Sequence, residues 1–236
     1  MSNSENFTAF QGKIIAIDGP AGSGKSTTAK LLAQHLGFTY LDTGAMYRAV
    51  ALAAIRQGVA FSDAEKVAKI ASKVHIKFVA EKTRGQLTLL DGEDVTEAIR
   101  SPEATAGSSA VAVHPGVRRE MVKRQMELGG NGNIVAEGRD TTSVVFPHAD
   151  LKIYLVADLK TRAQRRYLEA IARGDETTVE EQERLLEARD KNDTGRAASP
   201  LTQVADAVLV DTSGLTIEQQ VDKIIALARR TFAARP

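Results

Sequence analysis

Eight consecutive residues near the N-terminus have the types and spacing needed to bind phosphate. They read Gly19-Pro20-Ala21-Gly22-Ser23-Gly24-Lys25-Ser26 and match G-x-x-x-x-G-K-[ST] at every fixed position. In this motif glycines let backbone N–H groups turn toward an anion, the lysine neutralises outer phosphates, and the Ser26 hydroxyl is a ligand for Mg²⁺. A flexible glycine-rich turn is the alternative. Because an expected strand precedes the motif and an expected helix follows it, the sequence predicts a nucleoside triphosphate site that extends to Thr27.

Arginines recur in short polar segments at expected strand ends and helix starts. The segments are 42–48, Ser109 with Arg118, 137–140, one helix carrying Arg162, Arg165, Arg166 and Arg173, and 189–193 with Arg196. Guanidinium groups repel one another unless anions lie between them, and arginine suits bidentate phosphate contacts. We interpret the set as a site for two nucleotides placed phosphate to phosphate. The helix arginines could instead be a solvated face pairing with Glu169, Arg139–Asp140 a surface pair, and Tyr47 a packing residue.

The sequence shows no evident catalytic base. It lacks the H-R-D and D-F-G motifs of protein kinases. A phosphate monoester is mostly dianionic at pH 7 and attacks without being deprotonated, whereas an alcohol acceptor usually needs a carboxylate. The pattern therefore favours transfer of a phosphoryl group to another phosphate. The four histidines, His35, His75, His114 and His148, lack metal-ligand spacing.

The elements that must position these residues alternate between strand and helix. Short apolar runs predict strands at 13–18, 38–42, 133–137, 151–157 and 207–211, and helical periodicity follows at 26–36, 45–57, 158–173, 179–191 and from 216. Capping boxes at 62–65 and 216–219 predict two helix starts. The fold class is α/β, with a doubly wound, five-stranded parallel sheet.

A different pattern interrupts this alternation. Residues 74–80 and 86–92 flank a turn at 83–85 and predict an antiparallel hairpin. We therefore expect a lobe with a small antiparallel sheet and helices at 58–101, inserted in a core of 13–57 and 102–236. Residues 1–12 are expected to form a flexible tail.

Composition excludes several classes of protein. The 236 residues are 43% hydrophobic and 26% charged, which is typical of a globular chain and not of a disordered one. Thirty-one Lys and Arg against 30 Asp and Glu leave no global field for nucleic acid or an anionic membrane. The absence of Cys excludes disulfides and thiolate sites, and no apolar run reaches membrane-spanning length. We expect a cytoplasmic protein.

Six segments carry a close resemblance to a known family. They read IDGPAGSGKST, LDTGAMYRAVA, DGEDVTEAIR, AEGRDTTSVVFPHADLKIYL, RDKNDTGRAASPL and VLVDTSGLTIEQ, and together they resemble bacterial cytidylate kinases over about 13–234. The resemblance implies a monomeric P-loop kinase with an enlarged lobe that binds the nucleoside monophosphate and a helical lid near 165–190. It implies transfer of the γ-phosphate of MgATP to CMP or dCMP, a step of pyrimidine metabolism, with ATP and Mg²⁺ required.

The resemblance also implies roles for individual residues. Lys25, Arg139 and Arg189 would act on the transferring phosphoryl group, Arg165 and Arg166 would lie on the ATP side, and Ser26 would hold the metal. Thr43, Tyr47 and Arg48 would face the acceptor, with Arg48 and Arg139 on the CMP phosphate. Ser109, Arg118 and Asp140 would face the cytosine. Arg189 and Asp193 would serve the sugar hydroxyls and the transition-state charge, with Arg196 beside them at the substrate.

Two departures from the family pattern and three alternatives remain. Glu137 stands where relatives often carry Asp, and the N-terminal extension has no counterpart in shorter members; we expect neither to touch a proposed contact. Another P-loop kinase, acting on UMP or shikimate, would share the fold. A nucleotide-switch GTPase fits less well because no strand ends in N-K-x-D.

Overall fold

The computed structural model describes residues 10–81 and 83–233, which form two compact units. Unit 1 comprises the chain up to Leu41, Leu128–Gly195 and the chain from Ser199 onwards. Unit 2 comprises Asp42–Glu127 and Arg196–Ala198. Within the described ranges, no helix is both long and apolar enough to cross a membrane.

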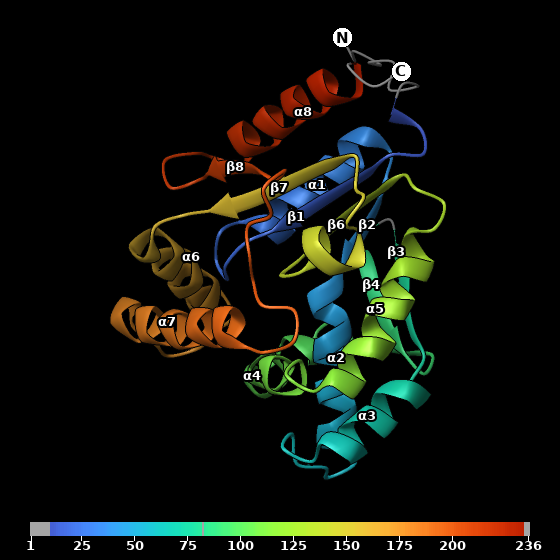
Figure 1. The fold of residues 1–236 in the computed structure, drawn as a ribbon. Helices are drawn as coiled ribbons and strands as arrows, with labels where there is room; N and C mark the ends of the chain where they lie inside the picture. Colours follow the sequence, from blue (N-terminus) through green and yellow to red (C-terminus); the bar gives the residue numbers. More distant parts are fainter. Residues whose placement is uncertain (1–9, 82, 234–236) are drawn as a thin grey trace. The chain divides into compact units, whose positions relative to one another are not determined.

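Unit 1 is built on a five-stranded parallel sheet in the order β2-β6-β1-β7-β8 (Figure 1). The strands are β1 (Ile14–Asp18), β2 (Thr39–Asp42), β6 (Ile134–Gly138), β7 (Leu151–Val156) and β8 (Val208–Asp211). The central strand β1 pairs in parallel with β6 on one side and β7 on the other. The predicted α/β fold with a five-stranded parallel sheet is confirmed.

Helices α1 (Lys25–Leu36) and α8 (Ile217–Ala233) share one apolar core with the sheet. The Thr216–Gln219 capping box begins α8 as predicted, with the two residues exchanging hydrogen bonds of 2.9 and 3.3 Å. Residues 1–9 of the expected tail lie outside the described residues. The tail boundary at residue 12 is wrong for Phe10, which is buried in this core and meets the Phe232 ring edge-on at a centroid distance of 4.7 Å.

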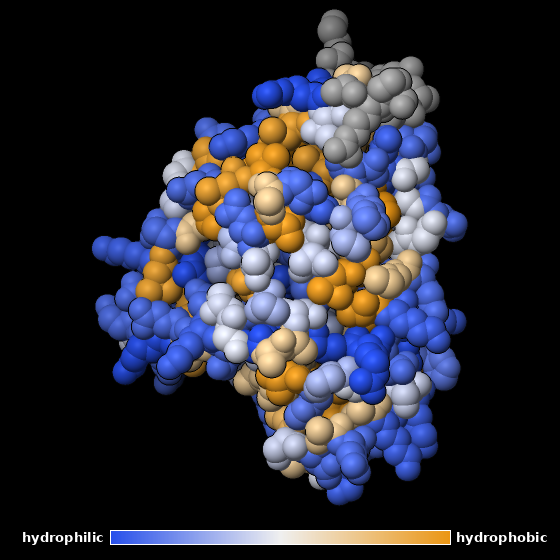
Figure 2. Space-filling view, viewed as in Figure 1, coloured by the Kyte–Doolittle hydropathy of each residue, from blue (hydrophilic) through white to orange (hydrophobic). Residues whose placement is uncertain are grey.

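Helices α6 (Leu159–Ala172) and α7 (Val179–Gly195) pack against each other in unit 1 (Figure 1). They cover the expected lid region near 165–190. Helix α7 ends four residues later than predicted, so that Asp193 is helical. Figure 2 shows apolar surface over the edge strand β8, where Val208 and Leu209 are exposed.

Unit 2 combines helices with a three-stranded antiparallel sheet in the order β3-β4-β5. The elements are α2 (Thr43–Arg56), α3 (Ala64–Lys73), β3 (Ile76–Glu81), β4 (Gly85–Leu90), β5 (Glu93–Asp94), the 3-10 turn η2 (Ala98–Arg100), α4 (Pro102–Val111) and α5 (Pro115–Gly129), which continues into unit 1. The predicted hairpin is present as β3 and β4. The capping box at 62–65 is wrong, because the Asp63 side chain caps α3 through the N–H of Lys66.

Unit 2 is larger than the lobe expected at 58–101. It includes α2, α4 and most of α5, because α2 packs closely against α4. The division of the chain into core and lobe at the sequence-based boundaries stays a prediction.

Candidate functional site

The phosphate loop lies between β1 and α1 in unit 1, as predicted. A Cβ at Gly19 would lie 2.0 Å from the carbonyl oxygen of Leu155, so only glycine fits there. Gly24 precedes α1 with a φ of 91°, and no side chain caps the helix. The first N–H groups of α1 are therefore available to an anion at the positive end of the helix dipole.

Lys25 is the first residue of α1 and is only 4% exposed. Its ammonium group donates a hydrogen bond of 2.7 Å to the carbonyl oxygen of Pro20. Burial lowers the pKa of Lys25 well below 10.5, and the positive charges of Arg139 and Arg166 lower it further against the opposing effect of two carboxylates. The positive charges of Arg139 and Arg166 thus act on Lys25, an arrangement that a polyphosphate would stabilise.

Glu137, near the end of β6, contacts Ser26 of the phosphate loop. The expectation that this residue contacts none of the proposed site residues is therefore wrong. Its carboxylate accepts a 2.6 Å hydrogen bond from the hydroxyl of Ser26, and Tyr40 donates to the same oxygen at 3.2 Å. Glu137 is 5% exposed. A carboxylate and a hydroxyl at the loop are oxygen ligands of the kind that Mg²⁺ prefers. The sequence did contain a signal for this role of Glu137. An acidic residue at the end of a strand next to the phosphate loop often helps to hold the metal ion.

Arg139 and Arg189 converge on Asp193. The Arg139 Nε donates to Asp193 at 2.7 Å, and the Nε of Arg189 lies 4.0 Å from the same oxygen. Burial opposes the charge of Arg139, but the attraction of Asp193, Glu137 and Asp18 together outweighs it and raises the pKa of Arg139. The Arg139 guanidinium is therefore stabilised by a buried carboxylate to which Arg189 is also close.

The arginines of α6 differ in their surroundings. Arg162 is buried and contacts Asp190 at 2.7 Å and the carbonyl of Ala21 at 3.2 Å, so it is not part of a solvated face. Arg165 donates to the carbonyl oxygens of Gly22 and Thr212, and burial lowers its pKa.

Arg166 lies on the exposed side of the same helix. It is 40% exposed and pairs with Glu169 at 2.6 Å, as the helix-face interpretation predicts. Its positive charge nevertheless lowers the pKa of Lys25.

In unit 2, Asp42 organises the start of α2. One carboxylate oxygen accepts from the N–H of Ala45 at 2.8 Å and caps the helix, and the other pairs with Arg48 at 2.8 Å. Thr43 is buried in the same turn. Asp42 therefore orients the Arg48 side chain. From sequence, Asp42 was predicted only as one residue of the segment 42–48.

Tyr47 and Arg118 are in contact within unit 2. The Arg118 guanidinium lies 5.6 Å from the centroid of the Tyr47 ring and donates to the carbonyl of Ala112 at 3.2 Å. Both residues are largely buried, and Ser109 on α4 is half-buried. The packing role considered for Tyr47 and its place in the predicted site are thus compatible.

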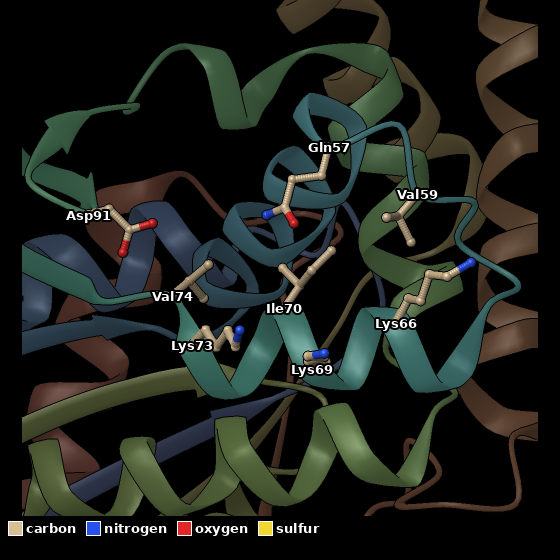
Figure 3. Close-up of a pocket in the computed structure, with 8 residues that line it drawn as sticks. All are labelled: Gln57, Val59, Lys66, Lys69, Ile70, Lys73, Val74 and Asp91. Carbon is tan, nitrogen blue, oxygen red and sulfur yellow. The ribbon is translucent and has the colours of Figure 1, made fainter.

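A hollow of about 390 Å³ in unit 2 lies apart from these residues (Figure 3). Three lysines of α3, Lys66, Lys69 and Lys73, line it together with the apolar residues Ile70 and Val74. None of the predicted site residues lines this hollow.

Comparison with known proteins shows to which family the chain belongs. The family model described as cytidylate kinase matches residues 15–230. The chain belongs to the cytidylate kinase family. It is 48% identical over 213 residues to the cytidylate kinase of Desulfitobacterium hafniense (strain Y51), covering 90% of this chain and 91% of that protein. It is 49% identical to the cytidylate kinase of Leuconostoc mesenteroides, with 92% and 95% covered.

A solved structure supports the fold of this cytidylate kinase family member. The shikimate kinase of Acinetobacter baumannii in complex with shikimate aligns with a TM-score of 0.50 at 19% identity, covering 95% of this chain and 97% of that one. At this identity the likeness shows the P-loop kinase fold alone.

The predicted residues of this cytidylate kinase family member fall into two groups. Unit 1 holds the phosphate loop with Lys25 and Ser26, together with Arg139, Asp140, Arg165, Arg166, Arg189 and Asp193. Unit 2 holds Thr43, Tyr47, Arg48, Ser109, Arg118 and Arg196. The joint action of the two groups on one pair of nucleotides stays a prediction. Among the described residues, no group of three or more His, Cys, Asp and Glu could hold a metal ion by itself.

Proposed function

We propose that this protein transfers the γ-phosphate of ATP to CMP or dCMP, giving ADP and CDP or dCDP. The observation that carries the proposal is a cytidylate kinase family match over residues 15–230, on a chain whose buried Lys25 opens the helix that follows the phosphate loop. We further propose that it works as a cytoplasmic monomer in pyrimidine nucleotide metabolism and binds neither nucleic acid nor membranes.

The donor side of the site is the phosphate loop. The backbone N–H groups of residues 19–24, all except Pro20, and the Lys25 ammonium would hold the ATP phosphates, with Arg165 and Arg166 beside them. Ser26 and Glu137 share a hydrogen bond of 2.6 Å and fit a small, hard cation as oxygen ligands. Mg²⁺ bound there would neutralise charge on the phosphates of ATP.

The acceptor side requires phosphate and base recognition. Arg48 and Arg139 would hold the CMP phosphate, which needs no base because its oxygen is already ionised at pH 7. Asp140 would accept from the exocyclic amine of cytosine, while Ser109 and Arg118 donate to its ring acceptors. Uracil carries an oxygen in place of that amine, and Asp140 would then face an acceptor without a proton between them.

The remaining residues would complete the reaction. Arg189 would stabilise charge on the phosphoryl group as it transfers, with Asp193 holding Arg139 and Arg189 in place. Thr43 and Tyr47 would shape the acceptor side, and Asp193 and Arg196 would contact the sugar hydroxyls. We propose that the α6–α7 region acts as a lid that excludes water, because water would otherwise compete for the phosphoryl group.

Measurement of ADP release with CMP, dCMP, UMP, AMP or shikimate as acceptor tests the proposal. The wild-type protein is expected to turn over with CMP and dCMP far faster than with the other acceptors. Asp140→Ala should lower kcat/KM for CMP by roughly 100-fold or more and leave UMP nearly unchanged. The exposed Asp222 of α8 offers a matched control, since Asp222→Ala should change neither. An unchanged CMP-to-UMP ratio in Asp140→Ala would contradict the base-reading role, and hydrolysis of GTP without any acceptor would favour a switch protein.

A further inference from the structure

Asp18 is a buried carboxylate that the proposed reaction does not use. It is the last residue of β1, directly before the phosphate loop, and is 0% exposed. Burial raises its pKa above 3.8, and hydrogen bonds from Thr141 and Thr142 oppose that shift. A buried carboxylate is costly unless its oxygens are fully hydrogen-bonded. Its position therefore calls for a specific role.

All four side-chain hydrogen bonds of Asp18 come from two neighbouring threonines. The Oδ1 atom accepts from the N–H of Thr141 at 2.9 Å and from its hydroxyl at 2.6 Å. The Oδ2 atom accepts from the N–H of Thr142 at 2.8 Å and from its hydroxyl at 2.6 Å. The four acceptor sites of one carboxylate are thus all used on one turn.

The two threonines begin the π-helical turn η3 (Thr141–Val145). The first N–H groups of a helical turn have no partner within it and need a cap. Asp140 occupies the N-cap position, but its side chain makes no capping hydrogen bond. Asp18, at the end of β1, caps the turn instead, so the Asp140 carboxylate is not used as the cap.

The segment 138–142, which leads into this turn, is held to β1 at both ends. Gly138 pairs with Asp18 in the β1–β6 ladder, and Thr141 and Thr142 are bound to the Asp18 side chain. Arg139 and Asp140 are the two residues between these attachment points. A short segment whose two ends are both attached to one residue has little conformational freedom. Asp18 therefore fixes the backbone from which the side chains of Arg139 and Asp140 extend.

We propose that Asp18 is a positioning residue that sets the placement of Arg139 and Asp140 and thereby the acceptor specificity of the enzyme. The inference rests on the proposed function, because it assigns these two residues to the acceptor. Asp18 itself acts through the turn and touches no substrate.

A second buried threonine offers a matched control. Thr212 is 0% exposed, and its hydroxyl hydrogen-bonds to the carbonyl oxygens of Ser23 and Val156, each at 3.0 Å. Its partner Ser23 belongs to the phosphate loop. Thr142→Val and Thr212→Val therefore remove the same hydroxyl from equally buried sites, one on the acceptor turn and one on the ATP loop.

The test compares steady-state kinetics of Thr142→Val, Thr142→Ser and Thr212→Val in the full chain. Thr142→Val is expected to lower kcat/KM for CMP about tenfold and to reduce the CMP-to-UMP ratio, while KM for ATP stays within about twofold. Thr142→Ser, which keeps the hydroxyl, should restore both values. Thr212→Val should raise KM for ATP and leave the CMP-to-UMP ratio unchanged.

A stronger variant extends the series. Asp18→Asn replaces one acceptor oxygen by an amide NH2 group that faces donors and removes the negative charge that attracts Arg139, so kcat/KM for CMP should fall roughly 100-fold. If this variant does not fold, the threonine variants still decide the question. A CMP-to-UMP ratio in Thr142→Val within twofold of wild type, or an equal loss of ATP binding, would overturn the proposal and leave Asp18 a purely structural residue.

Amide hydrogen exchange separates this inference from the proposed function. Thr142→Val should speed exchange of the amides at 139–142 and leave exchange in β7 unchanged, whatever the substrate is. Unchanged protection of the turn would overturn the positioning role even in an active enzyme. A wild-type protein without CMP-dependent turnover would instead overturn the proposed function.

Discussion

The Arg139–Asp193 pair of unit 1 and the Arg56–Glu93 pair of unit 2 have the same N–O distance of 2.7 Å but very different surroundings. The side chains of the first pair are 17% and 6% exposed, and those of the second are 41% and 60% exposed. The Arg162–Asp190 pair of unit 1 is also enclosed, at 9% and 24%. Within unit 2 the Arg48–Asp42 pair is enclosed as well, at 18% and 11%.

This difference follows the proposed roles of the residues. An exposed pair is screened by water and salt and contributes little to stability, whereas a buried pair interacts strongly and is costly to break. The enclosed pairs include Arg139, Asp193 and Arg48, which were predicted as site residues from sequence. In both units, enclosed ion pairs therefore coincide with residues that were predicted to bind phosphate.

The largest effect is expected at Lys25, the most enclosed cation of the phosphate loop. Lys25→Met should lower kcat/KM roughly 1,000-fold or more, because it removes the charge that we propose stabilises the transferring phosphoryl group. The Tm of the nucleotide-free protein should stay equal or rise, since methionine buries no charge. The exposed Lys30 of the same helix provides the control, and Lys30→Met should change neither value. A clear drop in Tm for Lys25→Met would show that burial of this charge is not costly.

A second large effect is expected where the buried pair is broken. Asp193→Ala leaves the Arg139 guanidinium enclosed without this carboxylate and should lower the free energy of unfolding by about 3 kcal/mol. Urea denaturation measures it. Asp193→Asn retains a hydrogen-bond acceptor and should lose less. Equal stability of Asp193→Ala and wild type would remove the distinction between buried and exposed pairs.

An effect of intermediate size is expected on the uptake of a proton when ATP binds. Burial and then neighbouring cations lower the pKa of Lys25 in the free protein, and bound phosphates would raise it again. ATP binding at a pH between the lowered value and 10.5 should therefore take up a proton, so that affinity falls as the pH rises through this range. Calorimetry in two buffers of different ionisation enthalpy measures the uptake. Lys25→Met should abolish it, and proton release on binding would contradict the sign.

The smallest effect is expected at the exposed pair of unit 2. Arg56→Ala should shift the Tm by less than about 2 °C, because both side chains remain well solvated without each other. Activity with CMP should stay within about twofold of wild type. A loss of stability as large as that of Asp193→Ala would show that exposure does not decide the strength of these pairs.

Local patterns were sufficient for the phosphate loop and most of the elements. The apolar run of β1, the glycines and the helical spacing of α1 are adjacent in the chain, so their combination is readable without a fold. The capping box at 62–65 failed because Asp63 lies beside Ser62, and a carboxylate and a hydroxyl can both cap a helix. Phe10 was missed because its partner Phe232 lies at the other end of the sequence.

Contacts between distant residues could not be predicted in this way. The partners Ser26 and Glu137 are 111 residues apart, and Asp18 is 123 residues from Thr141. Likewise, the spacing of Arg162, Arg165 and Arg166 on one helix was compatible with a solvated face. Packing against the phosphate loop buries the first and half-buries the second, whereas the third pairs with Glu169 and keeps 40% of its side chain exposed.

By itself, the sequence determined the chemical groups, the phosphate loop and the alternation of strand and helix, because each depends on residues within one or two turns of chain. The tertiary structure decided which charges are buried and which carboxylate holds which group. It brought β1 next to β6, and only this pairing places Asp18 and Glu137 where they can direct Thr141 and Ser26. Desolvation and hydrogen bonding depend on neighbours in space, and these exist only once the sheet has formed.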